Sequence, residues 1–400
     1  MVAPDLPIGD RVRHHRGTRR QDVVAGLVGI TPDYLSQIER NLKIPTIAVL
    51  HDIARELGVP TAALLSERVE PLAAGPETTA PAITQALMGY GLPHSAAPTA
   101  THVLRERVEA AWRSWQTSPT RFTDADLVLP SLIADTEHAL RAQRSAQDAG
   151  LRRDTLRVSS DLYFLLRSYL RRTGRVDLSL MAADRAMRAA EEADDPLRIA
   201  AAQWNLGHVL LAAQETDGAE QIALRGIQDL QPLADAGDED CAAMQGALHL
   251  VAVVASSRRK DWWKARDRLR NHAAPAAGRA GEGNVMWTVF GPTNVALHQV
   301  SIEMEAGEAG EALHTADRLD TSGLPSMERS FTFTLDVARC YDLRREDTAV
   351  LLHLLELEAM APEDLERTQL ARNMVLALMR RARAMHARQA EALAGRLGMV

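Results

Sequence analysis

The sequence predicts an all-α protein built from a small helical domain and a much longer stack of helix pairs. Aromatic residues make up only 4% of the 400 residues, whereas β-strands are enriched in aromatic and β-branched residues. Apolar side chains recur at spacings of three and four along most of the chain, which is the pattern of amphipathic helices. A chain of this length exceeds a single compact core, so a small domain followed by a repeat region fits it best.

The composition narrows the class of protein further. The net charge is −7, yet residues 11–20 hold five arginines, two histidines and no acid, so this short segment suits a nucleic acid. Cys241 and Cys340 lie within apolar helical patterns and are predicted to be reduced and buried. No Cys/His ligand spacing occurs, so neither a metal nor a cofactor is expected. Without a long apolar run or a signal-peptide pattern, the protein is expected to be cytoplasmic.

Residues 1–68 are predicted to form the small domain from five short helices. Gly17 breaks the chain after the first helix, and Gly29 closes the second in a left-handed conformation. Thr31 and Thr46 are good N-caps for the third and fourth helices, and Asn41 can adopt the left-handed conformation that ends the third. The predicted helices are Ile8–Arg16, Gln21–Val28, residues 32–40, Ile47–Leu57 and residues 60–65.

Residues 21–59, QDVVAGLVGITPDYLSQIERNLKIPTIAVLHDIARELGV, resemble the Xre/lambda-repressor-like helix-turn-helix family. The resemblance rests on Gln21, the small-residue helix and its glycine, the Ile-Glu pair and the Leu-Gly that ends the fourth helix. The sequence departs from the family at Asn41, where glycine is usual, and at Pro32, where a frequent base-contacting position becomes apolar. The resemblance implies a five-helix domain that binds double-stranded DNA.

In the family geometry the third helix enters the major groove with its N-terminus first. Gln37 is the best candidate for a base contact, because an amide pairs bidentately with adenine. Asp33 either accepts from a cytosine amine or only caps the helix, Tyr34 favours packing or a backbone contact, and Glu39 is expected to be structural. The resemblance implies that Gln21 binds a phosphate, and nearby basic residues would add phosphate contacts. The predicted DNA-binding residues are Arg19, Arg20, Gln21, Thr31, Asp33, Tyr34, Ser36, Gln37, Arg40 and Lys43.

Residues 69–102 are predicted to form a linker. They are rich in alanine, proline, threonine and glycine, and only residues 83–88 show a short helical pattern. Such a hinge would let two DNA-binding domains adjust to a two-fold site.

Residues 103–400 are predicted to form a solenoid of helix pairs. The clearest unit, residues 203–232, resembles a tetratricopeptide repeat through Leu206-Gly207, Ala219, Ala223 and its terminal proline. Weaker copies are spaced more irregularly than the usual unit of about 34 residues. The first helix of each pair would line a concave groove, where amides and aromatic rings suit a peptide or a small molecule. The predicted effector-binding residues are Phe164, Ser168, Trp204, His208, Asn294, Leu297, His298, Ser301 and Thr334.

Two further segments allow alternative interpretations. Residues 285–300 contain a helix break and restart near Thr293, which either exposes N–H groups that could hold a carboxylate or forms a turn with Trp287 and Phe290 buried. Residues 367–397 are predicted to form one C-terminal helix, which would cap the solenoid or make a dimer contact.

These features predict a DNA-binding transcriptional regulator rather than an enzyme, since no phosphate-binding loop or catalytic motif is found. The repeat region would bind a small-molecule or peptide effector and control a homodimer on a two-fold operator. The alternative is a repeat region that binds a protein partner. A deep, partly closed groove would favour the small ligand, and an open, shallow one the protein. The two-part architecture resembles bacterial regulators that join this helix-turn-helix to a tetratricopeptide-like sensor.

Overall fold

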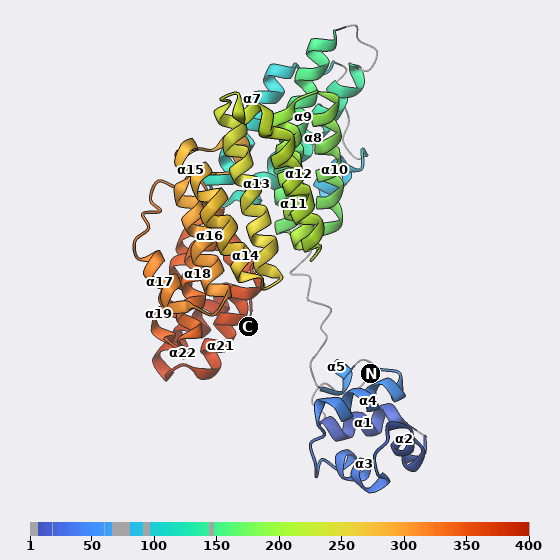
Figure 1. The fold of residues 1–400 in the computed structure, drawn as a ribbon. Coiled ribbons are helices and arrows are strands. Elements are labelled where there is room, and N and C mark those ends of the chain that lie inside the picture. The colour runs from blue at the N-terminus through green and yellow to red at the C-terminus, as the bar shows by residue number, and fades with distance from the viewer. Residues whose placement is uncertain are drawn as a thin grey trace. The chain divides into compact units, whose positions relative to one another are not determined.

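The computed structural model describes residues 7–17, 19–59, 61–65, 81–90, 97–143 and 148–399, and every regular element among them is helical. The chain divides into two compact units, Met1–Pro76 and Glu77–Val400 (Figure 1). This confirms the all-α fold predicted from the sequence. Both cysteines are free and buried, also as predicted. Among the described residues, none of the helices combines the length and apolar character needed to cross a bilayer.

The first unit has five short helices around one core. The left-handed residues predicted at Gly29 and Asn41 are present, with φ of 76° and 57°. The Thr31 hydroxyl caps the third helix by accepting from the Tyr34 N–H at 3.2 Å. Because these signals are local in sequence, the predicted boundaries are confirmed, apart from shifts of one residue at Arg40 and before the fifth helix. The helices are α1 Ile8–Arg16, α2 Gln21–Val28, α3 Pro32–Glu39, α4 Ile47–Leu57 and α5 Thr61–Leu65.

A close backbone contact fixes α3 against α1. The Gly9 N–H donates to the Asn41 side-chain oxygen at 2.8 Å. A Cβ atom added at Gly9 would lie only 2.0 Å from the Ile38 carbonyl oxygen. The glycine therefore lets the two helices approach at backbone distance and sets the position of α3.

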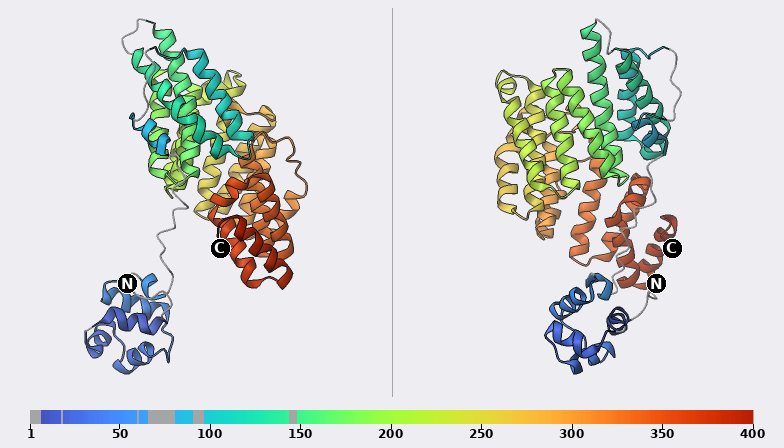
Figure 2. Two further views of the ribbon diagram at one scale, coloured as in Figure 1. Left: turned by 180° about the vertical axis from the view of Figure 1, so that it is seen from behind. Right: turned by 90° about the vertical axis from the view of Figure 1, so that its right-hand side faces the viewer.

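The second unit is a stack of helices in which neighbours along the chain pack on each other (Figures 1 and 2). The clear repeat unit is confirmed as a helix pair, α11 with α12. A short π-helical turn, Leu269–Ala273, and a 3₁₀ turn, Val285–Trp287, interrupt the stack. Its helices are α6 Pro81–Leu87, α7 Thr101–Thr117, α8 Arg121–Ala142, α9 Ala149–Arg172, α10 Val176–Glu192, α11 Pro196–Ala212, α12 Thr216–Asp235, α13 Glu239–Arg258, α14 Trp262–Arg268, α15 Ala274–Ala280, α16 Pro292–Glu305, α17 Ala309–Ala316, α18 Met327–Leu343, α19 Asp347–Met360, α20 Pro362–Arg367, α21 Gln369–Arg381 and α22 Ala384–Arg396.

The helix predicted within the linker is α6, and it belongs to the second unit. Its Ile83 and Leu87 side chains are buried, and it packs on α8. Most of the remaining predicted linker lies outside the described residues.

The single C-terminal helix predicted for residues 367–397 is wrong. The structure has two helices there, α21 and α22, which pack on each other across a turn at Ala382 and Arg383. Both turn residues are extended, with ψ of 161° and 152°. The turn contains neither glycine nor proline, so no local signal marks it. It lets Leu393 and Leu397 bury their side chains in the same core as Leu378.

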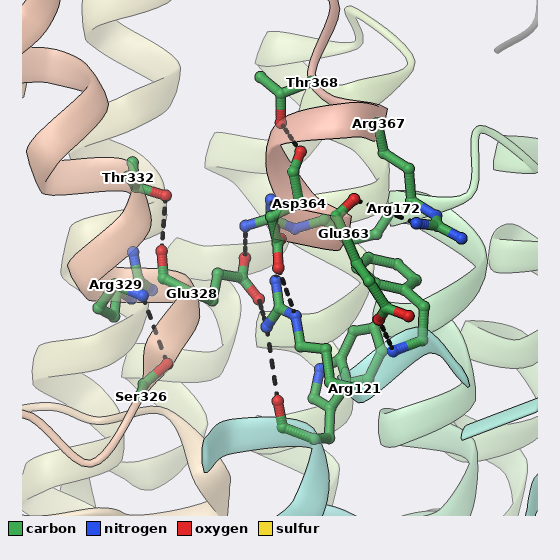
Figure 3. A network of polar contacts seen from close by, with 12 residues as sticks. Arg121, Arg172, Ser326, Glu328, Arg329, Thr332, Glu363, Asp364, Arg367 and Thr368 are labelled. Atoms are coloured by element: carbon green, nitrogen blue, oxygen red, sulfur yellow. Dashed lines mark hydrogen bonds and ion pairs between the residues drawn. The ribbon is translucent and has the colours of Figure 1, made fainter. Parts of the chain in front are cut away.

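Helix α20 returns to the start of α8. The Glu363 carboxylate accepts from the Phe122 N–H at 2.8 Å and so caps α8. Asp364 accepts from Arg121 Nε at 3.0 Å, across 243 residues of sequence. Figure 3 shows these contacts beside α18. They hold the last part of the stack against its first helices.

Candidate DNA interface and ligand cavity

Helix α3 exposes the face that the sequence predicts to bind DNA. Leu35 and Ile38 are buried in the domain core. None of the ten predicted DNA-binding residues is buried. Thr31, Asp33, Arg40 and Lys43 are exposed to solvent. These candidates are therefore accessible at the surface of the first unit, on α3 and in the segments before and after it.

Several of these side chains have partners within the domain. Gln37 Nε2 donates to Asp33 Oδ2 at 2.7 Å, so the two polar groups form one unit on the exposed face of α3. Arg20 pairs with Asp22 at 2.5 Å, and Arg19 donates to the Glu56 carbonyl oxygen at 2.8 Å. Exposed ion pairs of this kind contribute about 0–1 kcal/mol, so a DNA phosphate can replace them at small cost.

Glu39 has the structural role that the sequence indicates. Its side chain is buried and accepts from Arg16 Nε at 2.6 Å and from Gln21 Nε2 at 2.9 Å. The carboxylate thus ties α1, α2 and α3 together directly behind the exposed face. The Gln21 amide nitrogen, expected at a phosphate, is engaged with Glu39 in this structure.

The second unit contains a cavity of about 360 Å³ between its early and late helices. Six of the nine predicted effector-binding residues line it: Ser168, Trp204, His208, Leu297, His298 and Ser301. Phe164, Asn294 and Thr334 are buried in the core outside this lining. Phe164 and Asn294 share helix faces with Ser168 and His298, four residues later, so these two differ in their position along the helix rather than in register.

Sequence analysis missed the dominant feature of the cavity, which is its charge. Arginines dominate the charge of its wall. The wall also holds acids and, besides Trp204, the tryptophans Trp112, Trp115 and Trp287. The acids are Glu305, Glu328 and Asp336. The sequence feature that could have indicated this charge is the run of arginines at the end of α9, together with the arginine in the first turn of α18. The arginines in the lining are Arg121, Arg167, Arg171, Arg172, Arg258, Arg329 and Arg339.

Glu328 lies beside three of these arginines, of which Figure 3 labels Arg121 and Arg172. Arg172 Nη2 lies 2.5 Å and Arg171 Nη2 lies 3.0 Å from its Oε1 atom, and Arg121 Nη1 lies 3.9 Å from its Oε2 atom. Although burial opposes ionisation, the arginine charges hold the pKa of Glu328 well below its usual range. This part of the wall therefore already binds a carboxylate.

Two histidines line the same cavity, His298 buried and His208 partly buried. Burial lowers the pKa of His208 well below its usual value, and Arg167 and Arg171 add to the effect. Burial and Arg329 lower the pKa of His298 to about 3. Both rings are therefore neutral at physiological pH and add no positive charge to that of the arginines.

The break before α16 forms one edge of the cavity. Met286, Trp287 and Val289 all have positive φ, an unusual conformation for residues with side chains. The Trp287 ring stacks on Trp112 with centroids 5.2 Å apart, which anchors the segment to α7. The first turn of α16 is not open to a ligand carboxylate, because Glu282 accepts from the Thr293 N–H at 2.8 Å.

Asp336 is expected to make the stability of the second unit depend on pH. Burial raises the pKa of Asp336 to about 6, although Arg339 and Ser301 oppose the shift. Since the folded state favours the protonated acid, this stabilisation is present below the unfolded pKa near 4 and is lost as the pH rises through about 6. At pH 8 the free energy of unfolding of the Asp336→Asn variant is therefore expected to be about 2 kcal/mol higher than that of the wild type. Urea unfolding at pH 5 and pH 8 checks this, and a difference independent of pH contradicts it.

Comparison with known proteins supports the domain assignment of the first unit. Residues 17–64 match a family model described as helix-turn-helix. No curated protein matches the chain at a significant level. Similar solved structures include Bacillus thuringiensis PlcR in complex with the peptide PapR7 and DNA, which is 11% identical and covers 68% of this chain and 93% of its own, with a TM-score of 0.30. A TM-score this low supports no conclusion about the second unit. Residues 17–64 therefore form a helix-turn-helix domain, as the sequence resemblance implies.

Proposed function

We propose that this protein is a transcriptional regulator that binds duplex DNA through α3 and an effector in the cavity of the second unit. The observation that carries the DNA assignment is the accessible α3 face on a helix-turn-helix domain. Glu39 and Gly9 fix the helices behind this face, so the side chains on it are presented by a rigid scaffold. Preorganised presentation of this kind is what base recognition in the major groove requires.

The size of the cavity supports a small effector over a protein partner. Its volume of about 360 Å³ lies in the range of small-molecule sites, about 300–1,000 Å³. A protein partner would need an open surface. If the second unit bound only a protein, at a surface outside the cavity, the alternative function as a protein-binding regulator would be favoured.

A two-fold operator requires two copies of the DNA-binding domain, so we propose that the regulator acts as a homodimer. We assign it no catalytic role. Light scattering during size-exclusion chromatography measures the mass of the free protein, and the same measurement with an added duplex measures the complex. A single copy of the chain on every bound duplex would contradict the dimer.

Gln37→Ala is expected to weaken binding to the preferred DNA sequence by about 10–100-fold, because a good bidentate base contact contributes about 1–3 kcal/mol. Recovery and sequencing of genomic DNA bound to the purified protein first defines that sequence. Fluorescence anisotropy with the labelled duplex then gives the affinity at several salt concentrations.

Gln231→Ala provides the matched control for this experiment. Gln231 Nε2 also donates to an acid one helical turn away, Asp235 Oδ1, at 2.7 Å. This variant should retain the DNA affinity of the wild type. An unchanged sequence preference in Gln37→Ala would remove Gln37 from the base contacts. Absence of any salt-sensitive binding to duplex DNA by the wild type would overturn the proposed function.

A further inference from the structure

The cavity wall holds more positive charge than its acids compensate. Seven arginines and three acids line it, which leaves an excess of four positive charges. The excess is still three when Asp364, which lies behind Arg121, is counted. The neutral histidines add nothing to either side. Excess charge of one sign on partly buried side chains is costly, so binding of an anion in the cavity is favoured.

Three of the seven arginines have no carboxylate within 4.0 Å among the described residues. Arg258 is exposed and donates to the Leu211 carbonyl oxygen at 3.2 Å. Arg167 is buried, and its guanidinium donates from Nε to Asn205 Oδ1 at 2.7 Å. The Arg329 guanidinium makes no hydrogen bond to any described residue.

Arg167 and Arg329 are close enough to interact through their charges. Burial lowers the pKa of Arg167 to about 9, and Arg171, Arg172 and Arg329 lower it further while Glu328 opposes them. Burial also lowers the pKa of Arg329, while Glu328 opposes the shift and Arg172 adds to it. Both guanidinium groups line the cavity, and neither makes an ion pair within 4.0 Å with a described residue, although the Glu328 charge reaches both.

Tryptophan rings form the apolar part of the same cavity. Arg167 lies over the Trp204 ring, 5.4 Å from its centroid, and the stacked pair of Trp112 and Trp287 lines another side. Flat aromatic walls beside an anion site favour a ligand that combines a planar apolar group with an anionic one.

We propose that the cavity binds a small organic anion, a carboxylate, sulfonate or phosphate attached to a planar aromatic group, with Arg329 and Arg167 holding the anionic group. The side chain of Glu328, held by Arg171, Arg172 and Arg121, shows that this wall accepts carboxylates. The planar group lies among Trp204, Trp112 and Trp287. This ligand class rests on the proposed role of the cavity as the effector site.

The test uses the full-length protein and a pair of fluorescent probes that differ mainly in charge. These are 8-anilinonaphthalene-1-sulfonate and its neutral parent, N-phenyl-1-naphthylamine. Energy transfer from tryptophan to the bound dye gives both dissociation constants. We expect the wild type to bind the sulfonate about 10–100-fold more tightly than the neutral dye, as expected for hydrogen bonds to a charged group. Inorganic phosphate should compete with the sulfonate.

Arg329→Gln is expected to abolish this preference, whereas binding of the neutral dye stays within about twofold. Because the Arg329 guanidinium makes no hydrogen bond or ion pair with any described residue, the variant should melt at the same temperature as the wild type or higher. Arg188→Gln removes an exposed arginine that pairs only with Asp184 and should preserve the preference. Arg329→Lys should retain part of it.

No sulfonate binding, equal affinity for the two dyes in the wild type, or an unchanged preference in Arg329→Gln would overturn the proposal. DNA affinity measured on the same samples separates this result from the proposed function. Anion-selective binding without any effect on DNA affinity would leave the anion site standing and remove its role as an effector site. If the wild type did not bind DNA at all, that result would overturn the proposed function but not the anion site.

Discussion

Asp364→Ala is expected to lower the free energy of unfolding of the second unit by about 3–5 kcal/mol, as is usual when one partner of a buried ion pair is removed. The side chains of Asp364 and Arg121 are 1% and 0% exposed. The substitution leaves the Arg121 charge buried beside Trp115 and Phe122, whose rings it faces. It also removes a carboxylate oxygen 3.6 Å from Arg172 Nη1. The expected result is a less stable contact between α20 and α8.

Urea unfolding followed by tryptophan fluorescence measures this change. The control is Asp184→Ala, which removes an exposed partner of Arg188 and should cost less than about 1 kcal/mol. A double variant, Arg121→Met with Asp364→Leu, replaces both charges by apolar groups and should recover much of the stability. Equal small losses for Asp364→Ala and Asp184→Ala would show that the buried pair does not stabilise the closure.

Gly9→Ala is expected to destabilise the first unit by about 3 kcal/mol or more and to abolish DNA binding. Its new Cβ atom would lie 2.0 Å from the Ile38 carbonyl oxygen and 2.7 Å from Asn41 Oδ1. The first of these atoms belongs to the backbone of α3, so α1 and α3 must separate. Overpacking usually costs about 1–3 kcal/mol, and here no flexible side chain can move to relieve it. A domain of this size has little stability to lose.

Hydrogen exchange measured by mass spectrometry resolves the effect by segment. Peptides from residues 7–59 should exchange much faster in Gly9→Ala, and peptides from the second unit should not change. Gly26→Ala is the matched control, because a Cβ atom at that helical position meets nothing within 4 Å. It should stabilise α2 slightly, by about 0.5–1 kcal/mol. Unchanged protection of α1 and α3 in Gly9→Ala would contradict the packing argument.

Local signals explain how much of the fold could be predicted from the sequence. The caps and helix ends of the first unit depend on residues a few positions apart, such as Thr31 with Tyr34 and the left-handed Asn41. They were therefore accessible without the structure. The turn between α21 and α22 could not be predicted, because it arises from the burial of Leu393 and Leu397 in a shared core rather than from a helix-breaking residue.

The candidate site shows the same division. The spacing of one helix pair placed Trp204 and His208 at the cavity, and the same register carried Ser168 there. The charge of the cavity was out of reach, because Arg121, Arg172 and Arg329 come from helices far apart in sequence. They come together only in the folded second unit, and the spacing of residues within one repeat does not predict their contact.

The contact of α20 with α8 also has a consequence in time. Arg121 leaves the ribosome long before Asp364, which follows 243 residues later. At synthesis rates of about 5–20 residues per second, the buried arginine waits roughly 10–50 s for its counter-ion. A nascent or truncated chain that ends before α20 lacks this closure. Full translation would therefore precede ligand capture, whereas the DNA-binding domain, made first, can fold while the rest of the chain is still being synthesised.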